Sequence, residues 1–265
     1  MNLPLFKLGW RSLWRIFLGF ALLLTMYIAV IIPMFDPQIG GALAQLAQSM
    51  PELMAMFGMA GSGLTMTDFV ATYLYGMLMP LFPMIFSIIA ANRLVARHVD
   101  KGSMAYLLAA PVPRCRIVAT QLAVLLSSLI LLLAYCTGLC IAVCELSFPG
   151  QLETGPFLLM NLSLLGLHLA LAGVCFFASC LCNETKTSLA LGAGIPTVFY
   201  LIRMLANMGG RLDNLKYATV FSLFDAQGIL SGQDGALWMI PLLFLLGAVL
   251  FGASFLCFQK RDIPV

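Results

Sequence analysis

Six long apolar stretches dominate this 265-residue chain. The run LAVLLSSLILLLAY at residues 122–135 carries no charge and lacks the alternation of apolar and polar residues that marks a membrane β-strand. A helix crosses a bilayer with roughly 20 mostly apolar residues, and each stretch is about that long. The six predicted transmembrane helices cover residues 16–33, 69–91, 117–144, 157–182, 188–208 and 236–258.

Charged residues are too scarce for a soluble fold. They make up 9% of the chain, whereas a soluble domain carries about 25% to face water on all sides. Because the spans take up most of the length, no room remains for a separate catalytic domain. We therefore predict an all-α membrane protein in which residues 1–265 form one transmembrane domain.

Lysine and arginine gather on one side of the predicted membrane. Three of the eleven acidic residues lie on this side, together with eleven of the fourteen basic residues. The eleven basic residues are Lys7, Arg11, Arg15, Arg93, Arg97, Lys101, Arg114, Arg116, Lys186, Lys260 and Arg261. Since cytoplasmic loops carry the excess of Lys and Arg, we expect both termini in the cytoplasm. The basic face suits anionic lipid headgroups or an acidic protein partner.

Three segments outside the spans have patterns of their own. Apolar residues recur at helical spacing over residues 1–15, beside a row of basic residues, which favours an interfacial helix in the headgroup plane before the chain turns inward. An ordinary basic anchor is an equal alternative. In the outer loop 34–68, we expect a short helical pair interrupted at Pro51. The glycine-rich segment 209–235 could re-enter the outer leaflet.

The inner loop 93–116 is the longest polar segment on the basic side. Gly102 can end the preceding helix, and Ser103 can cap a short new one. Pro111 and Pro113 then force an extended connection to the third span. A short cytoplasmic helix held between two transmembrane helices suits the transmission of movement from a partner outside the membrane.

Few polar side chains lie within the spans. The candidates for a substrate path are Gln121, Asn161, His168 and Arg203. Arg203 could pair with Asp213, extend to the interface, or contact an anionic substrate or lipid. We interpret His168 as an interhelical hydrogen-bonding residue rather than as a ligand. The scarcity of buried carboxylates argues against a proton-coupled carrier.

The residues that nucleotide-binding and His-based metal sites require are missing from the sequence. No Gly-Lys pair occurs, so the chain has no nucleotide-binding P-loop, and we expect no catalytic residues. Two histidines are too few for a His-based metal site. We interpret the eight cysteines as packing residues, and the outer-loop methionines as packing rather than a copper relay.

The inner loop resembles a known signature. It has Asp-Lys-Gly-Ser at 100–103, Leu-Leu at 107–108 and Pro-Val-Pro-Arg at 111–114. These residues are similar to the acid-x-Gly-Thr/Ser, Leu-Leu and Pro-x-x-Arg elements of ABC-2 type permeases, the membrane subunits of type V ABC exporters. Residues 51–58 resemble that family's outer Pro-Leu-Phe-Gly element, and residues 258–262 its terminal Phe-x-x-Arg-Asp.

The resemblance implies a permease subunit of an ATP-driven exporter in the plasma membrane of a bacterium. A separate cytoplasmic ATPase would bind ATP and magnesium, and two permease copies, identical or paralogous, would form the membrane unit. Segment 1–15 would be the connecting helix, and loop 93–116 the coupling helix. The implied coupling residues are Arg93, Arg97, Asp100, Gly102, Ser103, Tyr106, Leu107, Pro111 and Arg114.

The sparse polar groups in the spans suit an amphipathic or hydrophobic cargo such as a peptide, lipid or drug. Two other functions stay open at this point. One is a non-transporting scaffold or sensor subunit of an ATPase complex, and the other an intramembrane enzyme that modifies lipids or peptides.

Overall fold

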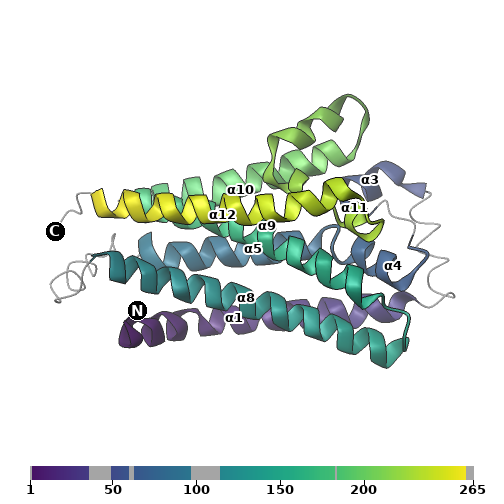
Figure 1. Ribbon diagram of the computed structural model, residues 1–265, viewed down its shortest axis with the longest axis horizontal. Helices are drawn as coiled ribbons and strands as arrows, with labels where there is room; N and C mark the ends of the chain where they lie inside the picture. Colours follow the sequence, from purple (N-terminus) through teal and green to yellow (C-terminus); the bar gives the residue numbers. More distant parts are fainter. Residues whose placement is uncertain (1, 36–48, 60–62, 97–113, 183, 261–265) are drawn as a thin grey trace.

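The computed structural model describes residues 2–35, 49–59, 63–96, 114–182 and 184–260. These ranges are helical and contain no strand. Six helices are long and apolar enough to cross a membrane, which confirms the prediction of an all-α protein with six spans. Figure 1 shows them side by side in an elongated bundle. We call the end where α1 begins and α12 ends the terminal end, and the opposite end the distal end.

The helical elements of the described ranges follow one another in chain order. They are α1 (Leu3–Ile31), η1 (Ile32–Phe35), α3 (Pro51–Met56), α4 (Met66–Tyr73), α5 (Leu78–Ala91), the π-helical η2 (Asn92–Ala96), α8 (Arg114–Ser147), α9 (Thr154–Leu181), α10 (Thr185–Asn207), η3 (Gly210–Ala218), η4 (Val220–Leu223), α11 (Ala226–Leu230) and α12 (Asp234–Lys260).

Helix α9 forms the centre of the bundle. It packs against α12, α10, α5 and α8, and most of its length is buried, whereas α1, α10 and α12 are largely exposed. Glycines allow α12 to approach closely: a Cβ added at Gly166 or Gly173 would lie 3.0 or 2.9 Å from the Cβ atoms of Leu243 and Leu250. Small residues at helix crossings are typical of packing within membranes.

The N-terminal segment is continuous with the first span. Helix α1 runs without interruption from Leu3 to Ile31, so no turn separates an interfacial helix from the membrane helix. An interfacial position for residues 1–15 stays a prediction, but the helix does not break at their end. The physical reason is that the apolar stripe continues in phase, with Leu13, Phe17 and Leu24 all buried on one face.

The second span is shorter than expected, because the chain breaks at residues 74–77 between α4 and α5. The amide of Met79 bonds the carbonyl of Leu74, five residues back, instead of continuing the regular ladder. Gly76 lies within the break and Pro80 follows it, and both disfavour a continuous helix. The single helix predicted over 69–91 is therefore replaced by two.

The other predicted segments have mixed outcomes. Pro51 starts α3, where its missing amide costs nothing, rather than interrupting a helix. Segment 209–235 holds η3, η4 and α11 at the distal end, and its insertion into a membrane stays a prediction. The short helix predicted in the inner loop lies outside the described residues.

Candidate functional site

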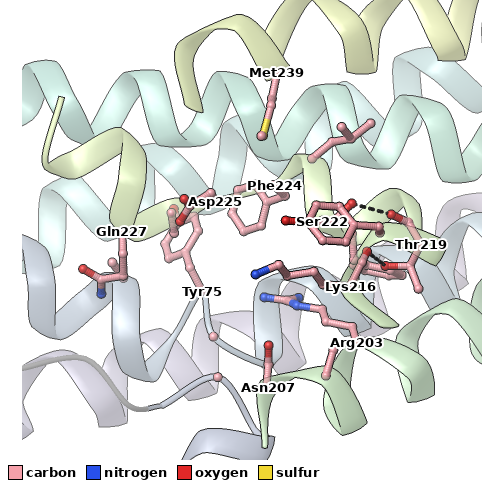
Figure 2. A pocket seen from close by; sticks show the side chains of 18 residues that line it. Tyr75, Arg203, Asn207, Lys216, Thr219, Ser222, Phe224, Asp225, Gln227 and Met239 are labelled. Atoms are coloured by element: carbon pink, nitrogen blue, oxygen red, sulfur yellow. Dashed lines mark hydrogen bonds between the residues drawn. The ribbon is translucent and has the colours of Figure 1, made fainter. Parts of the chain in front are cut away.

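A pocket of about 480 Å³ lies at the distal end of the bundle. The 74–77 break, the end of α10, the η3–η4–α11 segment and Met239 of α12 contribute its walls. Figure 2 shows the Arg203 and Lys216 side chains next to each other, with their nitrogen atoms directed into the pocket. Asp225 lies on the other side, beyond Phe224. Of the four predicted path residues, Arg203 is the one that lines this pocket.

The Arg203 guanidinium is held on one face by an aromatic ring. Its Cζ lies 5.5 Å from the centroid of the Phe221 ring, a cation–π distance, and Phe221 in turn packs edge-on against Tyr200 at 5.6 Å. The Nη1 atom of Arg203 is buried and has no hydrogen-bond partner among the described residues. The side chain of Asp213, its predicted ion-pair partner, lies outside the described part of the chain.

Asn161 joins three parts of the bundle. Its Oδ1 accepts hydrogen bonds from the Tyr75 hydroxyl and the Thr137 hydroxyl, each at 2.8 Å, and its Nδ2 donates to the carbonyl of Phe157 at 2.9 Å. These bonds tie the 74–77 break to α8 and α9. Because both the oxygen and the nitrogen of the amide bond protein groups, Asn161 acts in this structure as a helix-joining residue.

His168 hydrogen-bonds a carbonyl that a proline leaves unpaired. Pro83 has no amide hydrogen, so the carbonyl of Met79, four residues earlier in α5, has no donor from its own helix. The Nε2 atom of His168 lies 2.8 Å from that oxygen, and Nδ1 has no partner among the described residues. The contact agrees with the interhelical role predicted for His168.

Cys175 makes the same kind of contact one helix further on. Pro196 lies inside α10 and has no amide hydrogen, so the carbonyl of Gly192 lacks a donor from its own helix. The Cys175 thiol donates to this carbonyl at 3.2 Å. His168 and Cys175 are seven residues apart and therefore share one face of α9. Helix α9 thus supplies a hydrogen-bond donor to one carbonyl of α5 and one of α10, each left without its helical partner by a proline. The sequence offered both prolines but no sign of which side chain would meet them.

We expect His168→Leu to destabilise the protein by about 1 kcal/mol, because the Met79 carbonyl loses its donor within the membrane. In a Pro83→Ala background, residue 83 has an amide of its own for that carbonyl. The same His168 substitution should then cost less. Thermal unfolding of the four variants in one detergent measures the interaction as a double-mutant cycle. Equal costs in both backgrounds would refute the assignment.

Gln121 and two of the implied coupling residues, Arg93 and Arg114, lie toward the terminal end. The Oε1 atom of Gln121 is buried without a hydrogen-bond partner among the described residues, at the contact of α8 with Gly9 of α1. Arg93 lies in the π-helical η2, and its Nε donates to the Ser12 hydroxyl of α1 at 2.9 Å. Arg114 starts α8. The other implied coupling residues, Arg97, Asp100, Gly102, Ser103, Tyr106, Leu107 and Pro111, lie outside the described ranges.

The cysteines are single thiols. All eight lie within the described ranges and none forms a disulfide; six are buried, Cys115 is exposed and Cys257 is half-buried. In the same ranges, no three His, Cys, Asp or Glu side chains gather as metal ligands would.

The geometry describes a polytopic helical membrane protein with a cationic pocket at one end and a basic surface at the other. A family model described as "ABC-2 family transporter protein" matches residues 6–263. The chain therefore belongs to the ABC-2 family of transporter proteins, and it is a membrane permease of an ABC-type system. Permeases of this family generally pair with a cytoplasmic ATPase subunit. No curated protein and no solved structure matched the chain.

Proposed function

We propose that this chain is the permease subunit of an ATP-driven exporter and moves an amphipathic or hydrophobic substrate outward. A separate cytoplasmic ATPase, which binds ATP and magnesium, drives two permease copies in the plasma membrane of a bacterium. The observation that carries the proposal is the family match over nearly the whole chain, together with six spans.

The basic terminal end is the docking side for the ATPase. Lys7, Arg11 and Arg15 lie on the first turns of α1, and Arg116 on the first turn of α8. The excess of Lys and Arg on this side supports a cytoplasmic location. Both termini then lie in the cytoplasm, as does loop 93–116.

Loop 93–116 transmits the movement of the ATPase. The Arg93–Ser12 hydrogen bond connects its first residue to α1, and the Asn92 side chain donates to the carbonyl of Thr185 at 3.4 Å, where α10 begins. A push on the loop therefore reaches α1 and α10 through these bonds, in addition to the two spans that the loop joins. The π-helical turn at Asn92–Ala96 supports this role, since such turns are frequent at functional sites.

Substitutions in the loop test the proposal. In the complex with its ATPase, we expect the double variant Asp100→Ala and Arg114→Ala to keep ATP hydrolysis while substrate movement falls by roughly tenfold, because the loop no longer transmits closure of the ATPase. The measurement is ATP-dependent uptake into inverted vesicles of three fluorescent reporters: a phospholipid, a peptide and a hydrophobic dye.

The matched control is Lys186→Ala. Lys186 is an exposed cation at the same end of the bundle but outside the loop, so its removal should leave the ratio of uptake to hydrolysis unchanged even where it weakens docking of the ATPase. Unchanged uptake in the Asp100/Arg114 variant would contradict the coupling role.

A further inference from the structure

We propose that the distal pocket binds the phosphate group of a membrane phospholipid, with Arg203 as its main anchor. This inference goes beyond the proposed transport function and does not depend on it, because lipid binding can be measured on this chain alone.

The surroundings of the Arg203 guanidinium favour the binding of an anion. Phe221 covers one face of its guanidinium, and the buried Nη1 has no hydrogen-bond partner among the described residues. A buried donor on a charged group that lacks a partner is costly, so a ligand that accepts its hydrogen bond gains this energy. The planar guanidinium matches two phosphate oxygens at once, which makes arginine a preferred phosphate ligand.

Lys216 adds positive charge to the pocket, and the carboxylate of Asp225 already accepts a hydrogen bond from the protein. The Lys216 ammonium lies beside Arg203 in the pocket (Figure 2) and 5.3 Å from the Tyr217 ring centroid. Asp225 lines the far side, but its Oδ1 accepts the amide of Gly228 at 2.9 Å and caps α11. Two cations therefore face the part of the pocket nearest α10, which favours an anion there.

The pocket lies at the level where the helices leave the membrane. Arg203 is four residues before the end of α10, and Trp238 four residues after the start of α12, each about 6 Å from the helix end. The side chains of Trp238 and Tyr217 are 78% and 77% exposed. Exposed Trp and Tyr at helix ends are typical of the interfacial belt, the layer that contains lipid phosphates.

The volume fits a headgroup and leaves the acyl chains outside. At about 480 Å³ the pocket is in the range of small-molecule sites. Leu242 of α12 lies three residues after Met239, which lines the pocket, and its side chain is 47% exposed, so it offers an apolar surface along which acyl chains can lie. The ligand is therefore a phosphate joined to an apolar tail, rather than a free ion.

The test is native mass spectrometry of the purified full chain with added phosphatidylglycerol. We expect one tightly bound lipid and a loss of affinity of roughly tenfold in Arg203→Gln, which removes the charge and the paired donors. Diacylglycerol with the same acyl chains lacks the phosphate and should bind weakly to both proteins. Arg116→Gln, which removes an exposed arginine at the terminal end, should leave the tight site unchanged.

A second variant and a competition experiment distinguish lipid binding from the alternatives. Arg203→Lys keeps the charge but not the planar fork, and should bind with intermediate affinity even where Arg203→Gln folds poorly. Displacement of the lipid by an equal concentration of inorganic phosphate would overturn the lipid assignment in favour of the free ion. Unchanged phosphatidylglycerol affinity in both Arg203 variants would also overturn the proposal, leaving Arg203 as a structural partner of a residue such as Asp213.

Discussion

Replacement of Gly76 by alanine should be among the most damaging single-methyl changes in this protein. Gly76 is buried in the break between α4 and α5, against the turn that follows α3. An added Cβ would lie 2.6 Å from the carbonyl oxygen of Gly58, and it would also clash with the carbonyl of Thr72. Both neighbours are backbone atoms, so no rotation of a side chain can relieve the overlap.

We expect Gly76→Ala to cost about 3 kcal/mol, the upper range for overpacking, and to lower the melting temperature by roughly 5–10 °C. Gly138→Ala is the matched control, because a Cβ there meets nothing within 4 Å in the exposed middle of α8. As an ordinary helical Gly→Ala change, it should be neutral or slightly stabilising. Equal melting temperatures for the two variants in the same detergent would contradict the packing described here.

The number and kind of the spans could be predicted from sequence because membrane insertion depends on local composition. Each apolar stretch is long enough to be recognised alone. The break in the second span could not be located in this way. Leu74 and Tyr75 are as apolar as a helix interior, and Gly76 and Pro80 also occur inside membrane helices, so these residues alone do not mark a break. The close approach of Gly76 to Gly58 is apparent only in the fold.

The four polar residues in the spans were identified from sequence, but their roles depend on partners that sequence does not indicate. The contact of His168 with Met79 depends on Pro83, and Asn161 is occupied by Tyr75 and Thr137. Lys216 and Phe221 come from the 209–235 segment, whose irregular η3 and η4 have no periodic signal. Their approach to Arg203 therefore became apparent only in the fold.

The second prediction with a large expected effect is the association of this chain with an ATPase subunit. The chain belongs to a family of ABC transporter proteins, and under the proposed function the energy for transport comes from an ATPase subunit. The basic terminal end offers a surface for it, and the family generally pairs with a cytoplasmic ATPase. We expect the association to be stoichiometric and to survive extraction in mild detergent.

The measurement that tests this central claim most directly is affinity purification of the chain from its native host, followed by mass spectrometry of the co-eluting proteins. The account predicts a soluble protein with a P-loop in a constant ratio to this chain. Recovery of the chain alone, from a preparation in which other membrane complexes of that host stay intact, would contradict it.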